Sequence, residues 1–246
     1  QSYMGRLIYS FEGKYLLTAT LRDDGSSVFP NKKYFLYPAV SLGWNVSDEN
    51  FMKNQNLVNT LKLRAGWAKT SNQSIGAYSS LGSLSTNFYN FGLPGATGST
   101  LANGYFVSTL GNQELTWEFT NSINLGLDFG LLHNRITGTI DVYSQRTDHI
   151  LQQVKLPPSN GATSYFANLG KTKGEGLELS LSSINIQSKD GFNWSTDFNI
   201  SFNRDAIVAL HEGIKQDIGN NWFVGQTFNV IYDLKKIGIW QKDEAA

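Results

Sequence analysis

The stretch of sequence that decides the fold runs from Thr116 to Tyr143 and reads TWEFTNSINLGLDFG (116–130), LLHN (131–134) and RITGTIDVY (135–143). On both sides of 131–134, large apolar side chains alternate with polar or charged ones. Successive side chains of a β-strand point to opposite faces. The stretch therefore predicts a long antiparallel hairpin with one apolar and one polar face. The apolar positions are Phe119, Ile123, Leu125, Leu127, Phe129, Ile136, Ile140 and Val142.

Composition narrows the class of protein. The 246 residues carry 20 basic and 20 acidic side chains, so the net charge of zero gives no indication of a nucleic-acid partner. Charged residues make up 16% of the chain, below the about 25% of typical soluble domains. The absence of cysteine excludes thiolate catalysis, cysteine-ligated zinc and disulfides. No apolar run is long enough for a transmembrane helix, although alternating strands can still cross a membrane.

The alternation of the hairpin recurs along the chain. It predicts about nine strands, and the segment 47–60 is the one with some helical character. The other expected strands are 3–11, 15–22, 34–46, 61–69, a strand around 177–182, 192–203 and roughly 228–240.

The connections between these strands alternate in length. Those at 12–14, 131–134 and 188–191 are short, whereas 70–113 and 146–168 are long. In an up-and-down sheet this places tight turns at one end and long loops at the other, which is typical of outer-membrane β-barrels. Aromatic residues near both strand ends fit two girdles at the membrane boundaries. They are Phe11, Tyr15, Trp44, Phe129, Phe192 and Trp194 at the short-turn end, and Trp67, Trp117, Tyr143 and Phe202 at the long-loop end. The alternative is an aromatic core inside a soluble β-sandwich.

An odd strand count is unusual for a bacterial barrel, and both ends of the sequence look cut. We therefore expect a fragment of a larger barrel, whose open edges pair with strands from outside this chain.

The sequence resembles the C-terminal barrel part of the SusC/RagA family of TonB-linked outer-membrane transporters from Bacteroidetes. The resemblance covers nearly the whole chain. Among the stretches that carry it are GKYLLTATLR (13–22), PAVSLGW (38–44), LKLRAGW (61–67), LTWE (115–118), NLGLDF (124–129), GEGLEL (174–179) and GIWQ (238–241).

This resemblance implies a fold and a transport function. The parent would be a barrel of 22 strands, a size given for plugged transporters, with long extracellular loops and short periplasmic turns. It would import glycans or peptides with a SusD-like lipoprotein lid, driven by TonB, without cofactor or enzymatic activity. Residues 1–246 would be a partial barrel domain that lacks the signal peptide, the plug and the final strands. The remaining alternatives are a passive porin-like barrel and a soluble structural or interaction β-protein.

Two groups of residues are candidates for a role in transport. Charged side chains on the polar parity would face the lumen, where they hold the plug, line the route or form an ordinary hydrated wall: Arg6, Arg22, Arg64, Glu118, Asp128, Asp141, Glu178 and Asp197. Aromatic residues of the loop 70–113 would contact substrate or lid, or pack loop on loop: Tyr78, Phe88, Tyr89, Phe91, Tyr105 and Phe106.

No catalytic or metal site is expected. Asp148 and His149 adjoin but lack a third group that would activate a nucleophile. The sequence Asp23-Asp24-Gly25 lacks the spaced carboxylates of a calcium loop.

Overall fold

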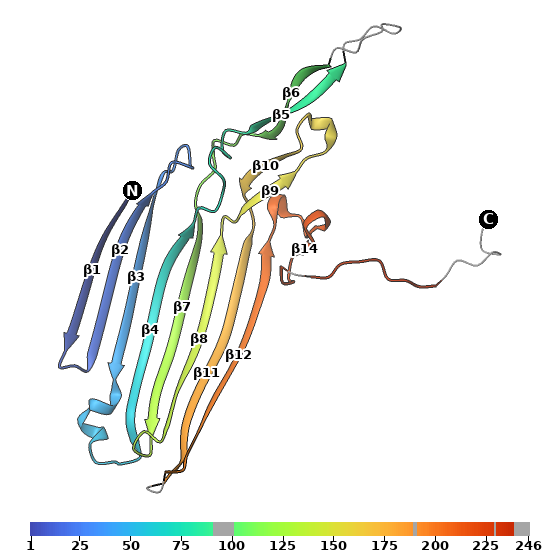
Figure 1. Ribbon diagram of the computed structural model, residues 1–246. Helices are drawn as coiled ribbons and strands as arrows, with labels where there is room; N and C mark the ends of the chain where they lie inside the picture. Colours follow the sequence, from blue (N-terminus) through green and yellow to red (C-terminus); the bar gives the residue numbers. More distant parts are fainter. Residues whose placement is uncertain (91–100, 189–190, 229, 239–246) are drawn as a thin grey trace.

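The computed structural model describes residues 1–246 except 91–100, 189–190, 229 and 239–246. Its main element is a sheet in which eight long strands lie side by side (Figure 1). All neighbouring pairs in this sheet are antiparallel. In spatial order the strands are β1 Ser2–Phe11, β2 Tyr15–Gly25, β3 Tyr34–Asn45, β4 Val58–Asn72, β7 Glu118–Leu131, β8 Ile136–Asp148, β11 Lys171–Gln187 and β12 Asn193–Ala209.

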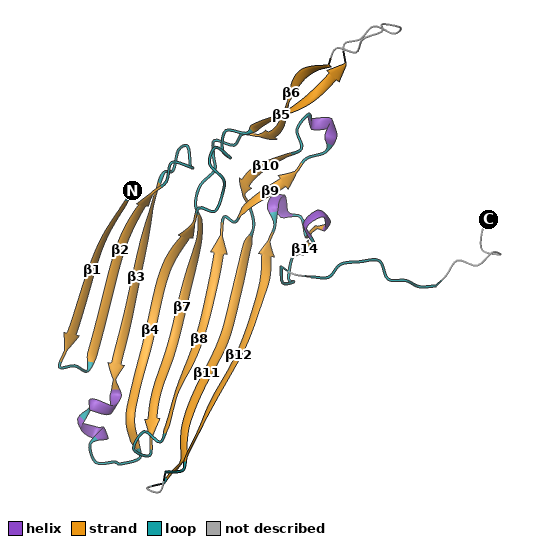
Figure 2. Cartoon of the chain, viewed as in Figure 1, coloured by secondary structure: helices purple, strands orange, loops and turns teal. Residues whose placement is uncertain are grey.

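The expected up-and-down barrel wall is confirmed as an open sheet. Sequence order and spatial order agree throughout, and short connections lie at one end with long ones at the other (Figures 1 and 2). No described strand pairs with the outer edge of β1 or of β12. Within the described part of the chain, no helix is long and apolar enough to cross a membrane.

The short connections depend on backbone conformations that few residues adopt. Between β1 and β2, Glu12 and Gly13 both have positive φ angles, of 52° and 69°. A tight turn with this pair of angles matches the twist of the strands that it joins. Between β7 and β8, the amide of His133 donates to Oδ1 of Asn59, at 2.6 Å, which ties this turn to the start of β4.

The intermediate connection between β3 and β4 contains the expected helical character. It forms two turns of 3₁₀-helix, η1 Val46–Asp48 and η2 Asn50–Met52. Further short helices lie in the other connections: η3 Pro158–Asn160, η4 His211–Gly213 and η5 Ile218–Asn220.

A second, smaller sheet lies beyond the long-loop end (Figure 2). Its order is β5-β6-β10-β9, with β5 Ser83–Asn90, β6 Leu101–Leu110, β10 Ser164–Asn168 and β9 Leu151–Lys155. β6 and β10 pair in parallel, so the two longest connections share one sheet. These strands were not predicted, because their sequences lack a clear period of two. A short pair, β13 Gln216–Asp217 and β14 Trp222–Phe223, follows β12.

The strand expected at 228–240 is wrong for its described residues. Residues 230–238 form no strand and extend away from the sheet (Figure 1). The side chains of Ile231, Leu234 and Ile237 are at least 95% exposed. A strand requires a neighbour that pairs with its backbone, and no described backbone group pairs with residues 230–238.

Candidate functional site

The cross-strand registers give the main sheet one apolar and one polar face. Leu125 lies opposite Ala65 of β4 and Val142 of β8, and Val142 lies opposite Leu177 of β11. These apolar side chains are not covered by protein, since 56% of Leu125 is exposed. The apolar face therefore requires a partner other than the described part of the chain.

The opposite parity places all eight predicted charged residues on the polar face. Three of them meet in one cluster. Arg64 of β4 contacts Asp128 of β7, with Nη2 2.9 Å from Oδ1, and Asp141 of β8, with Nη2 3.0 Å from Oδ2. The Nε atom of Arg64 also donates to Asp128, so that contact is bidentate.

Gly126 makes this cluster possible. It lies directly between Arg64 and Asp141 in the register of the three strands. A Cβ atom at Gly126 would be 2.5 Å from Cζ of Arg64 and 2.7 Å from Oδ1 of Asp141. The missing side chain thus lets the guanidinium lie flat across β7 and reach both carboxylates.

The other predicted residues of the polar face are not joined to this cluster. Arg6 donates to Thr20 at 3.3 Å, and Arg22 pairs with Asp24 at 2.8 Å. Asp197 accepts a hydrogen bond from Ser182. Glu118 accepts from the amide of Leu151 at 3.0 Å. Glu178 lies opposite Asp141, and no described residue forms an ion pair with it.

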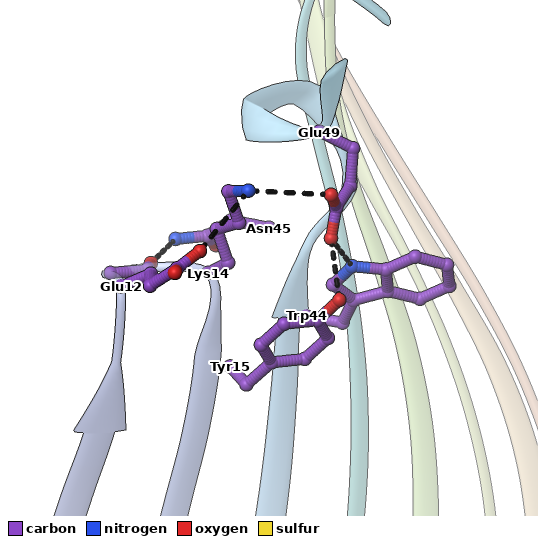
Figure 3. Close-up of polar contacts among 7 residues, drawn as sticks. Glu12, Lys14, Tyr15, Trp44, Asn45 and Glu49 are labelled. Atoms are coloured by element: carbon purple, nitrogen blue, oxygen red, sulfur yellow. Dashed lines mark hydrogen bonds and ion pairs between the residues drawn. The ribbon is translucent and has the colours of Figure 1, made fainter. Parts of the chain in front are cut away.

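At the short-turn end, Glu49 connects two aromatic rings to the first turn (Figure 3). Oε1 of Glu49 accepts from the hydroxyl of Tyr15 at 2.6 Å and from Nε1 of Trp44 at 3.2 Å. Its Oε2 is 3.4 Å from Nζ of Lys14. The rings of Phe11, Tyr15 and Trp44 stack in series. Three of the residues predicted for the aromatic girdle at the short-turn end therefore form one row.

The same contacts shift the pKa values of Glu49 and Lys14, which both lie outside the strands. The hydrogen bond from Tyr15, then that from Trp44, holds the pKa of Glu49 below its usual value. Burial opposes the charge of Lys14, but its contacts with Glu12 and Glu49 outweigh burial and raise the pKa of Lys14.

At the long-loop end, a small hydrophobic core forms around Trp117. It consists of Phe29, Leu115 and Trp117, which are 0%, 1% and 3% exposed, packed against Phe35, Ile75, Leu151 and Phe166. The indole Nε1 donates to the carbonyl of Lys32 at 3.0 Å. The prediction that Trp117 belongs to a girdle facing lipid is therefore wrong, because the loop 26–33 folds over its ring.

Phe119 also departs from the prediction that it faces lipid. Its ring contacts Phe35 and His149, at centroid distances of 5.9 Å and 5.1 Å. Nζ of Lys69 lies 4.3 Å from the centroid of Phe119. The pairing of β3 with β4 ends at Ala39 and Ala68, below these residues, so the strands separate and Phe35 reaches Phe119.

A groove of about 680 Å³ opens beside this core. A second hollow, of about 460 Å³, adjoins it and shares four of its residues: Asn31, Lys32, Thr116 and His149. The aromatic rings of Phe35, Trp117 and Phe119 line the first hollow, while Asn112, Glu114 and Asn168 line the second. Aromatic faces beside amide, ammonium and carboxylate groups can bind an oligomer of sugars or amino acids.

Sequence reasoning missed this groove, because its residues come from three connections. The described aromatic residues of the loop 70–113, which were predicted to contact substrate or lid, lie farther from the main sheet. Tyr78 precedes β5, and the register of β5 with β6 puts Phe88 and Tyr105 on one face and Tyr89 and Phe106 on the other. No ring contact between two of them occurs in the described part of the chain. Phe91 lies outside the described residues. Among the described strands, Phe88 and Tyr105 therefore lie on the opposite face from Tyr89 and Phe106.

The adjacent residues Asp148 and His149 contact different partners. Asp148 contacts Lys171, and His149 faces the ring of Phe119. No group of three His, Asp or Glu side chains that could hold a metal occurs among the residues that the structure describes.

The chain was compared with known proteins. Residues 1–234 match the family model described as TonB dependent receptor-like, beta-barrel. TonB-dependent receptor P39 of Formosa agariphila is 34% identical over 246 residues, which cover 99% of this chain and 23% of that protein. TonB-dependent receptor SusC of Bacteroides thetaiotaomicron is 38% identical over 221 residues, which cover 88% of this chain and 21% of that protein.

The structure was also compared with solved structures. A structure of the RagAB peptide transporter superposes with a TM-score of 0.80 and 27% identity, covering 92% of this chain and 24% of that one. The siderophore receptor PirA from Pseudomonas aeruginosa, at 14% identity and a TM-score of 0.52, shares the fold alone. The chain spans between 21% and 25% of the length of the curated relatives that it matches.

Proposed function

The chain belongs to the TonB-dependent receptor β-barrel family of the outer membrane, and from this premise we propose that it is a wall segment of a longer receptor. The receptor imports nutrient oligomers, glycans or peptides, with energy delivered by TonB. Its partners are a SusD-like lipoprotein lid and TonB, which engages a part of the receptor outside this segment. The relatives are receptors and transporters by name rather than enzymes.

The observation that carries this proposal is the pair of faces of the main sheet. A barrel wall in lipid requires exposed apolar side chains outside and tolerates charge inside, and the registers supply both. In this orientation the cluster of Arg64, Asp128 and Asp141 faces the lumen, together with the other predicted charged residues. The long loops are extracellular, and the row of Phe11, Tyr15 and Trp44 lies at the periplasmic boundary.

The groove beside Trp117 is then on the extracellular side, where a substrate or the lid first meets the receptor. The rings of Phe35 and Phe119 beside the exposed amide of Asn31 suit stacking and hydrogen bonding to a sugar. The amide groups of Asn112 and Asn168, in the adjoining hollow, donate to backbone carbonyls and hold its wall in place. Lys32 and Glu114 equally suit the charged ends or side chains of a peptide. Both substrate classes stay within the proposal.

The test measures uptake of fluorescent oligosaccharides and oligopeptides by cells that express the full-length receptor with its lipoprotein. We expect uptake of one of the two classes, and we expect it to stop when TonB is deleted. Uptake that persists without TonB would identify a passive porin-like barrel instead. A receptor that fractionates with soluble proteins would contradict both membrane assignments.

A further inference from the structure

On β8, β11 and β12, the outward face of the sheet changes from apolar to charged between two neighbouring rows of paired residues. The last fully apolar row across these strands is Val142, Leu177 and Phe202. Two residues nearer the long-loop end, the row is Ser144, Glu175 and Arg204. Lys173 occupies the next row, with Arg146 on one side and Ala206 on the other. Because directly paired residues share a face, these charged side chains point outward, in line with the apolar band.

This surface carries an excess of positive charge. Four cations, Arg146, Lys171, Lys173 and Arg204, form what we call the basic patch. The carboxylates on the same rows are Asp148 and Glu175. Asp148 is 3.3 Å from Nζ of Lys171 and 3.7 Å from Nε of Arg146, whose side chain is 56% exposed. No described residue forms an ion pair or side-chain hydrogen bond with Lys173 or Arg204.

An apolar trough leads up to the basic patch. A hollow of about 480 Å³ on this face is lined by Leu125, Val142 and Phe202 and, in the next row, by Ile123, Ser144, Glu175 and Arg204. It shares Leu125 and Val142 with a larger hollow of about 860 Å³ that continues toward the short-turn end along Leu63, Leu127 and Ile140. A slender apolar chain can therefore lie along the sheet with its polar end at the basic patch.

The height of the cations above the last apolar row matches the thickness of the lipid headgroup region. Two residues of a strand rise about 7 Å, or about 5 Å along the membrane normal at a tilt of about 40°. Arg204 is thus about 5 Å and Lys173 about 10 Å above the last apolar row. The headgroup region of one leaflet is roughly 5–8 Å thick, and long basic side chains reach back toward it.

We infer that the outer surface of β8, β11 and β12 binds a phosphorylated lipid of the leaflet on the long-loop side. Its phosphate contacts Arg146, Lys173 and Arg204, and its acyl chain occupies the trough. The inference rests on the proposed membrane orientation. Charge complementarity favours an anionic headgroup, and the continuous apolar trough favours a lipid over a free phosphate ion.

The test uses the full-length receptor, purified in a neutral detergent, and native mass spectrometry with dioctanoyl phosphatidic acid as the probe. Dioctanoyl phosphatidylcholine, which has the same chains and a zwitterionic headgroup, serves as the lipid control. The test variant replaces Arg146, Lys173 and Arg204 with Gln. The matched control variant replaces three exposed lysines outside the strands, Lys53, Lys235 and Lys236, with Gln, so both lose three charges.

We expect phosphatidic acid to bind the wild type and the control variant alike, and the test variant about a hundredfold more weakly, since each cation near an anionic surface contributes about 1 kcal/mol. The single variant Lys173→Gln, which breaks no ion pair within the described protein, should lose about fivefold. Added salt should weaken binding to the wild type.

Several outcomes would overturn the inference: equal binding of both lipids, equal binding to the test and control variants, or displacement of the lipid by inorganic phosphate at matched concentration. The test variant could instead lose the lipoprotein that co-purifies with the receptor, while it binds lipid as the wild type does. That result would assign the surface to a protein partner and would also overturn the inference. TonB-dependent uptake by the same cells reports separately on the proposed function, so the two failures are distinguishable.

Discussion

At the scale of single residues, a missing side chain determines how the polar face is organised. Arg64 reaches two carboxylates across Gly126, where a Cβ atom would collide with its guanidinium. Gly126→Ala should therefore displace Arg64 and lower the free energy of unfolding by about 1 kcal/mol, as expected for a half-exposed ion-pair network. The measurement is the urea midpoint of the full-length receptor in detergent.

Gly66→Ala is the matched control for this substitution. Gly66 lies on the same face in β4, and the nearest atom to its Cβ would be a carbonyl oxygen at 4.0 Å. It should be neutral or slightly stabilising, because alanine loses less backbone freedom on folding than glycine. An equal loss in both variants would mean that the cluster of Arg64, Asp128 and Asp141 does not stabilise the wall.

Glu49 makes stability at the short-turn end depend on pH. Its pKa in the folded protein is lowered from the usual value of 4.5, chiefly by the hydrogen bond from Tyr15. The stabilising contribution is therefore fully present above about pH 4.5 and is lost as the pH falls through the lower, folded pKa. We expect Glu49→Gln to flatten the loss of stability between about pH 5 and 3. Thermal unfolding across this range measures the effect.

Asp48→Asn is the control for that measurement, since Asp48 is the neighbouring exposed carboxylate. It should leave the acid limb of the stability curve as it is in the wild type. Identical acid limbs for Glu49→Gln and the wild type would contradict the role given to Glu49.

At the scale of elements, the faces of β7 can be tested with adjacent substitutions. Leu125→Arg puts a charge on the apolar face at mid-strand and should cost about 2–4 kcal/mol in a bilayer. Asn124→Arg puts the same charge on the polar face and should cost far less. Folding yields of the full-length receptor in lipid vesicles at several urea concentrations distinguish the two. Equal costs would contradict the assignment of faces.

The core around Trp117 fixes the loop 26–33, and this gives a second test of an element. Trp117→Ala removes a fully packed ring and its hydrogen bond to Lys32, a loss of about 3–5 kcal/mol in a well-packed core. The loop should then open, and trypsin added to intact cells should cleave after Lys32 and Lys33 faster than in the wild type. Phe88→Ala, whose ring is 70% exposed, should leave cleavage unchanged. Slow cleavage in Trp117→Ala would contradict this role of the core.

The sequence predicts those elements that a membrane constrains, and fails elsewhere for a physical reason. Strands such as β7 and β8 alternate along most of their length, because one face meets lipid and the other does not. The small sheet of β5, β6, β9 and β10 lies beyond the long-loop end of the main sheet (Figure 2), and Ser83–Asn90 and Leu101–Leu110 show no such period. The strand predicted at 228–240 does not form in its described residues, because no neighbouring strand pairs with their backbone there.

The candidate site was predicted in the same partial way. Parity alone placed Arg64, Asp128 and Asp141 on one face. Their contact depends on the register between strands 64 residues apart, which a period of two does not specify. The groove beside Trp117 depends on three connections folding together, and no local pattern in any of them indicates it.

At the scale of the whole molecule, the described chain has no large core of its own. Its buried hydrophobic cluster consists of Phe29, Leu115 and Trp117, while most large side chains of the apolar face are exposed. The isolated 246-residue chain should therefore aggregate in buffer without detergent, since an exposed apolar face and two open strand edges both promote association. Size-exclusion chromatography measures this. A stable monomer in plain buffer would contradict the barrel-wall assignment.

The core around Trp117 has a consequence for how such receptors change specificity. Phe29, Leu115 and Leu151 come from three different connections and pack together with Trp117. A graft that transfers one loop from a relative would bring one part of this packing without its partners. The natural unit of exchange is thus the set of three loops together with the start of β7. Recombination among paralogous receptors is expected to be tolerated when its breakpoints fall within the transmembrane strands, and to be disfavoured when they fall between these loops.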